Sequence, residues 1–174
     1  LTAATLFIVI GIMAAWWFNG GNIDSVKPYV DPYNNYTEAE LTAMQDKGDI
    51  EATAELGWRN FNKGDLEKAY ALYKKAADKN NAKGLTGLGL YYAHIGKYGE
   101  SFKYFEAAAE QDYTVAIFNL GVAYANGDGC KQDSQKAFTL LKTAAEKGYS
   151  PAQRVVGVYY LEGVGTVVNK KKGF

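Results

Sequence analysis

The sequence predicts an all-α fold, an α-solenoid of stacked antiparallel helical hairpins, because three patterns return along it at nearly the same period. A Leu-Gly pair occurs three times and a Val-Gly pair once, at spacings of 32, 32 and 36 residues. Each pair follows a small residue by four positions, and an Ala-Ala pair returns in phase. The small residues are Ala52, Gly84, Ala116 and Ala152, the pairs are Leu56-Gly57, Leu88-Gly89, Leu120-Gly121 and Val156-Gly157, and the Ala pairs begin at Ala76, Ala108 and Ala144. Such a period is typical of a repeat array.

Each repeat is predicted to form two helices. In the first helix, the small residue, the Leu four places on and an aromatic residue eight places on share one face. The Gly after the Leu allows a neighbouring helix to come close. In the second helix, apolar residues recur at spacings of three and four, as in Ala69, Leu72 and Ala76. One hairpin cannot bury its own apolar faces, so stacked neighbours supply the core.

Residues 1–18 are predicted to form a transmembrane helix. They contain no charge and end in Trp16, Trp17 and Phe18. A spanning helix needs about 20 apolar residues, and indole rings favour the headgroup region. A cleaved secretory signal and a buried core helix remain alternatives. The start also faintly resembles a mature type IV pilin, although Thr5 stands where pilins usually carry Glu.

Residues 19–36 are predicted to be a linker, and the repeat array is predicted over residues 37–174. The linker has no helical period, contains two Pro residues and carries one basic against two acidic residues. This weakly acidic flank favours the non-cytoplasmic side of a membrane. Thr37 and Glu40 have the spacing of a capping box where the array begins. The first full repeat departs from the pattern, with Asn60 at the aromatic position and Phe61 beside it, and the last repeat is incomplete.

The string AIFNLGVAYANGDGCKQDSQKAFTLLKTAAEKGYSPA, from Ala116 to Ala152, resembles a Sel-one-like repeat, a close relative of the tetratricopeptide repeat. The resemblance covers roughly residues 41 to 174. It rests on Ala116, Leu120, Gly121, Tyr124, Gly127, Gly129, Asp133, Ala137, Ala144, Ala145 and Gly148. It implies a protein-binding solenoid whose first helices line a concave face.

The composition offers little for catalysis or nucleic-acid binding. The 19 Lys and Arg residues balance 19 Asp and Glu residues, so no basic field would gather nucleic acid. His94 is the only histidine and Cys130 the only cysteine, which leaves no pair for a metal or a thiol-based site. We therefore expect no enzyme activity, no catalytic or metal-binding residue, no cofactor and no small-molecule substrate.

The expected protein-binding surface is the concave face that the resemblance implies. Its predicted residues are Trp58, Leu90, Phe118, Val122, Ala54, Thr86 and Arg154. An apolar groove with aromatic anchors would take a peptide or a helix. The alternative for Trp58 and Phe118 is that they belong to the core between repeats.

The function predicted from these features is that of a membrane-anchored protein–protein interaction scaffold or adaptor. The chain would be a single-pass membrane protein, with its repeats on the periplasmic side of a bacterial inner membrane. The alternative is a structural accessory subunit of a multi-protein membrane complex or filament.

Overall fold

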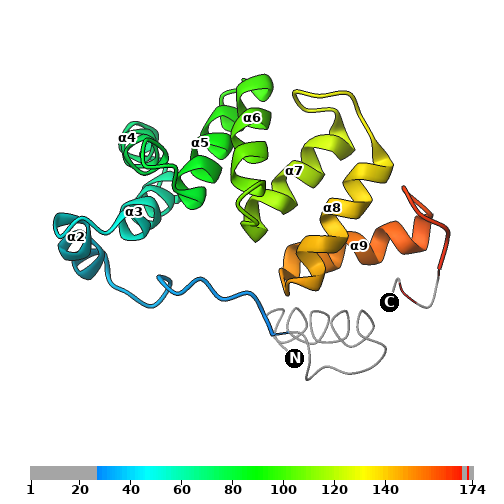
Figure 1. The fold of residues 1–174 in the computed structure, drawn as a ribbon, viewed down its shortest axis with the longest axis horizontal. Coiled ribbons are helices and arrows are strands. Elements are labelled where there is room, and N and C mark those ends of the chain that lie inside the picture. The colour runs from blue at the N-terminus through cyan, green and yellow to red at the C-terminus, as the bar shows by residue number, and fades with distance from the viewer. Residues whose placement is uncertain (1–26, 170–171, 173–174) are drawn as a thin grey trace. The chain divides into compact units, whose positions relative to one another are not determined.

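The computed structural model describes residues 27–169 and 172, and within them the chain forms eight α-helices and no strand (Figure 1). The helices are α2 (Glu38–Asp46), α3 (Ile50–Asn62), α4 (Leu66–Ala77), α5 (Ala82–His94), α6 (Tyr98–Ala109), α7 (Thr114–Asn126), α8 (Ser134–Glu146) and α9 (Ser150–Glu162). The all-α solenoid predicted from the sequence is confirmed.

The transmembrane helix predicted over residues 1–18 lies outside the described residues, as does the predicted linker up to residue 26. Among the helices at residues 27–169, none combines the length and the apolar character that crossing a membrane requires.

Two compact units make up the chain. The N-terminal unit comprises Val30–Ala116 with Asp128–Cys130 and contains α2 to α6. The C-terminal unit contains the remaining described residues, with most of α7, α8 and α9.

Side-chain caps set where several of the helices begin. Thr37 and Glu40 form the predicted capping box at α2, each bonding the backbone N–H of the other. The Asp49 carboxylate accepts from Ala52 N at the start of α3. Such caps satisfy backbone N–H groups that have no partner within the helix.

Glycines bring the helices of the N-terminal unit together. A Cβ atom on Gly57 of α3 would lie 2.7 Å from the Tyr73 ring of α4, and one on Gly87 of α5 would overlap the same ring atoms, Cδ1 and Cε1. Tyr73 is therefore held between the two first helices. Gly89 meets Phe105 of α6 in the same way, with 2.5 Å to the ring. The close approach predicted for the repeated Gly is confirmed at Gly57 and Gly89.

Gly121 of α7 plays the same part in the C-terminal unit. A Cβ atom there would lie 2.9 Å from Leu141 Cγ of α8. Leu141, Ala144 and Val156 are fully buried. The same hairpin packing therefore recurs at the same position of the second helix, and the four extra residues of this repeat lie in the loop between α7 and α8.

The first full repeat has Asn60 where the other repeats have an aromatic residue, and the structure shows how this residue is accommodated. Its side chain is buried, and Nδ2 donates to Leu56 O at 2.7 Å, so the amide stays within its own helix. Phe61 takes over the aromatic contact, with its ring centroid 6.4 Å from that of Tyr73. The aromatic position has shifted by one residue.

We expect Gly87→Ala to lower the free energy of unfolding by about 1–3 kcal/mol, because the added methyl group would overlap the Tyr73 ring in a filled core. Chemical denaturation of the full chain measures this loss.

Gly99→Ala is the matched control, since a Cβ atom on this exposed helical residue would meet nothing within 4 Å. It should be neutral or stabilising by about 0.5–1 kcal/mol. Equal effects at the two glycines would show that helix propensity, and not the approach to Tyr73, governs Gly87.

Candidate functional site

The 30–36 segment, which precedes α2, forms a turn against the first helices of the N-terminal unit. Asn34 N donates to Asp31 O at 3.2 Å, and Tyr33 N donates to Asp31 Oδ1 at 2.9 Å. Asp at the first position and Pro at the second are the residues that such a turn favours. The Asp31-Pro32-Tyr33-Asn34 turn therefore presents the side chains of Asp31 and Tyr33 in a fixed arrangement.

Lys83 of α5 is the main residue that binds this turn to the helices. Its Nζ lies 2.6 Å from Asp31 Oδ2 and 2.6 Å from Glu55 Oε2 of α3. The other Glu55 oxygen accepts from Arg59 Nε at 2.9 Å, and Arg59 Nη2 donates to Tyr33 O at 3.2 Å. Two cations and two carboxylates thus form one network across α3, α5 and the turn.

The network is largely shielded from solvent. The exposed fractions of the side chains are 3% for Glu55, 9% for Lys83, 19% for Asp31 and 22% for Arg59. Burial by itself would lower the pKa of Lys83, but its hydrogen bonds to Asp31 and Glu55 outweigh that effect and raise it. Lys83 therefore remains charged and needs its carboxylate partners.

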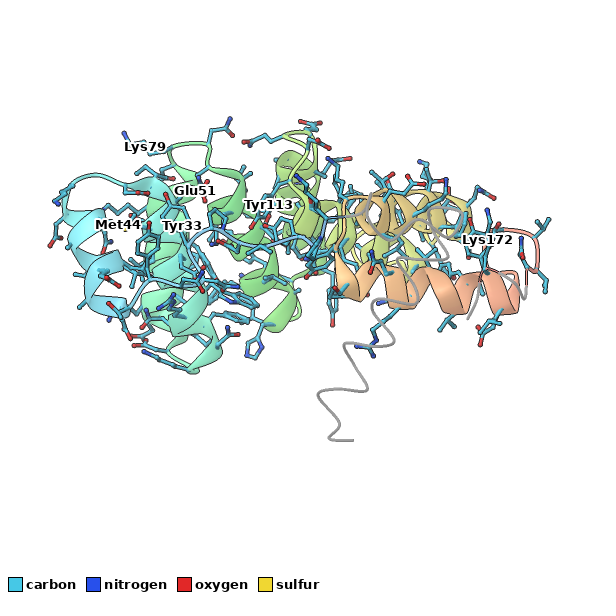
Figure 2. The ribbon with its side chains drawn as sticks, turned by 90° about the horizontal axis from the view of Figure 1, so that it is seen from below. Tyr33, Met44, Glu51, Lys79, Tyr113 and Lys172 are labelled. Carbon is cyan, nitrogen blue, oxygen red and sulfur yellow. The ribbon has the colours of Figure 1, made fainter. Side chains whose placement is uncertain are left out.

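Tyr33 makes the other contacts between the turn and the helices. Its hydroxyl donates to Asp49 Oδ2 at 3.0 Å, and Lys83 Nζ lies 5.7 Å from its ring centroid. The ring packs against the cluster formed by Leu41, Ala52 and Leu56, and Figure 2 shows it near Met44, a further member of the cluster. Burial and the bond to Asp49 raise the pKa of Tyr33 to about 12. The hydroxyl is therefore a donor at neutral pH.

We call Asp49, Glu55, Arg59 and Lys83 the Lys83 site. It offers a cationic position for a carboxylate, an acceptor for a hydroxyl and an apolar surface for the ring between them. None of its members was among the predicted site residues. The Glu55–Arg59 spacing of four is visible in the sequence and could have suggested a charged patch. The pairing of Lys83 with Asp31, 52 residues apart, has no sequence signal.

The predicted concave-face residues take different positions. Trp58 is 40% exposed, on the same side of α3 as Glu55 and Arg59. Ala54 and Thr86 are buried, and Leu90, Phe118 and Val122 are half-buried, whereas Arg154 is exposed. The Trp58 ring stacks on Phe61 at 6.4 Å between centroids. Phe61 in turn meets His94 edge-on at 5.6 Å.

In the C-terminal unit, Phe118 packs against Tyr149, with ring centroids 5.1 Å apart. The Tyr149 ring also contacts the Tyr29 ring edge-on, with the ring centroids 5.8 Å apart. Tyr29 N donates to Gly148 O at 3.1 Å. Residues from the predicted linker therefore contact each unit through a separate set of bonds.

The charged groups of the Lys83 site are paired with one another and with the turn. In the described part of the chain, no group of three or more His, Cys, Asp or Glu side chains is arranged to hold a metal ion.

We expect Asp31→Asn and Lys83→Met to be coupled in a double-mutant cycle by about 0.5–3 kcal/mol of unfolding free energy, because each removes the partner of a shielded charge. Denaturation of the parent, both single variants and the double variant gives the coupling.

The control cycle uses Lys74→Met and Asp78→Asn, an ion pair at 2.8 Å whose side chains are both exposed. Its coupling should be much smaller, since solvent screens it. If the cycle with Asp31 gave no more coupling than this control, the turn would not be held on the Lys83 site in solution.

The comparisons with known proteins agree with the repeat architecture. Residues 50–81, 82–113, 114–149 and 150–174 each match the Sel1 repeat. The chain is similar to a protective antigen present in uropathogenic Escherichia coli strains that displays an SLR fold. That match has 28% identity and a TM-score of 0.66, and it covers 80% of this chain and 32% of the antigen.

The fold is also similar to that of a Sel1 repeat protein from Oxalobacter formigenes. This match has 24% identity and a TM-score of 0.61, and it covers 78% of this chain and 42% of the other. The chain thus spans less than half the length of either protein. No curated protein matches the sequence. Sel1 repeat proteins generally mediate protein–protein interaction. Because the four matches cover most of its length, the chain belongs to the Sel1 repeat family.

Proposed function

We propose that the chain is a scaffold that binds a partner protein through the first helices of its repeats. The observation that carries this proposal is the 30–36 segment itself. The surface formed by α3 and α5 holds a short peptide turn through a charge network and an aromatic contact. A surface that binds its own chain in this way has the chemistry to bind a segment of another protein.

The exposure of the Trp58 side chain also supports the proposal. Large aromatic side chains dominate the energy of protein interfaces, and they do so when a partner desolvates them. Trp58 is 40% exposed and stacks on Phe61, so it is held in one orientation and is accessible. The alternative that it belongs to the core between repeats does not fit this exposure.

The proposal includes a membrane anchor formed by residues 1–18. An uncharged stretch of this length that ends in Trp16, Trp17 and Phe18 supports it. The weakly acidic flank that follows supports a periplasmic location of the repeats, at a bacterial inner membrane. The chain is proposed to act without a cofactor and without enzyme activity, because its sequence offers no catalytic set.

Removal of residues 1–18 is expected to abolish membrane association while leaving the repeats folded. The measurement is flotation with lipid vesicles, with circular dichroism as the control for folding. A shortened chain that still floats with the vesicles would contradict the anchor.

Trp58→Ala is expected to weaken partner capture at least tenfold, in line with an anchor worth more than about 1.4 kcal/mol. It should cost much less stability than the about 3–5 kcal/mol of a buried aromatic residue. Capture from extracts of the producing cells, together with a denaturation curve, measures both effects.

Tyr98→Ala is the matched control, because Tyr98 is 46% exposed but lies on α6, a second helix. It should capture the partner as the parent does. Equal loss in both variants, or no loss in either, would place the binding surface elsewhere.

A further inference from the structure

The 30–36 segment is held on the N-terminal unit by few side chains. Asp31 and Tyr33 are partly buried, whereas the other five residues of the segment are exposed. Segments with little buried apolar area open at a small cost compared with the whole unit. The segment can therefore leave the Lys83 site while α2 to α6 stay folded.

Release of the segment would take away one of the two carboxylates bound to Lys83. With Asp31 in place, the two cations Lys83 and Arg59 face the two carboxylates Asp31 and Glu55. Without it, Lys83 and Arg59 share Glu55, and Lys83 has lost one of its two carboxylate partners in a shielded position. A shielded lysine is less stable with fewer carboxylates beside it, so the open site favours any ligand that brings back a carboxylate.

The second requirement is an aromatic hydroxyl at a fixed distance from that carboxylate. Tyr33 follows Asp31 by two residues, donates to Asp49 and packs beside Leu41, Ala52 and Leu56. Pro32 sets the turn that points both side chains at the protein. A ligand with the acid but no Tyr, or with both in an extended strand, would satisfy only half of the site.

We infer that the Lys83 site is a recognition site for a turn of Asp-Pro-Tyr type in a partner protein, and that the 30–36 segment occupies it as an internal competitor. The inference rests on the proposed function and gives the partner its chemistry. Partner binding requires displacement of the segment, because Asp31 already occupies the position beside Lys83 Nζ that the partner's carboxylate would take.

An internal competitor has a high effective concentration, of the order of millimolar for a short tether. A peptide added in solution therefore sees only the small open fraction of the parent chain, and its apparent affinity falls by that fraction. Substitutions that weaken the binding of the internal segment should therefore raise the apparent affinity of the added peptide.

The test uses a fluorescent peptide with the sequence KPYVDPYNNY, which is that of residues 27–36, and the full chain in mild detergent. Fluorescence anisotropy gives its Kd for the parent and for the Asp31→Ala/Tyr33→Ala variant. We expect the variant to bind at least about tenfold more tightly. Asn35→Ala, an exposed change in the same segment, should bind as the parent does.

Two further changes test the specificity. Adding Lys83→Met to the double variant should weaken peptide binding by about tenfold or more, whereas Lys79→Met, at an exposed lysine, should not. Replacing Asp by Asn in the peptide should weaken binding to a similar degree. Circular dichroism checks that each variant is folded, and Asp31→Asn replaces the double variant if that one does not fold.

The inference is overturned if the folded variant with a weakened segment binds the peptide no better than the Lys83→Met variant does. It is also overturned if the parent forms a dimer that the peptide dissociates, because the site would then serve exchange between copies. Loss of partner capture in Trp58→Ala with no effect of Lys83→Met would leave the proposed function standing and remove this site from it.

Discussion

The packing of Tyr73 between Gly57 and Gly87 is the contact on which the N-terminal unit depends. A Cβ atom on either glycine would clash with the ring, so the ring fixes how near α3 and α5 come to each other. That separation allows Glu55 of α3 and Lys83 of α5 to meet at 2.6 Å. The packing has a cost, since the Tyr73 hydroxyl is buried without a hydrogen-bond partner, which typically opposes folding by about 1–3 kcal/mol. Burial accordingly raises the pKa of this hydroxyl. The packing of the ring therefore decides the residue at this position, although its hydroxyl group has no hydrogen-bond partner.

The Lys83 site follows from this geometry. In a solenoid, each first helix lies beside the next, and charged residues on that side face a neighbouring helix more than solvent. A lysine placed there is stable only with carboxylates around it, and α3 supplies one, Glu55. The second comes from Asp31, outside the helices. Because Asp31 belongs to a segment outside the helices, the network is a structural contact and, in our proposal, also a site that another acidic group can occupy.

In the proposed function, Trp58 and the Lys83 site offer a partner two different kinds of contact on the first helices α3 and α5. Trp58 and Phe61 provide apolar area, which gives affinity when water is excluded. Lys83 and Arg59 provide directional charge, which discriminates between partners more than it adds affinity. The aromatic part was accessible to sequence reasoning, because Trp58 stands out by its type and repeat position. The charged part was not, because Lys83 and Glu55 look like ordinary surface residues until the packing of α3 against α5 shields them.

The sequence by itself determined the helices, their pairing and their phase. Small residues, Leu-Gly pairs and capping residues such as Thr37 and Asp49 act locally or at a fixed period, so their effect is readable from the order of residues. Only the tertiary structure decided that residues 30–36, part of the predicted linker, lie against α3 and α5, because that contact joins Asp31 to a lysine 52 residues away. It also decided that Phe61 takes the place left by Asn60. Contacts between residues far apart in sequence depend on the final separation of the helices, and no local pattern encodes that distance.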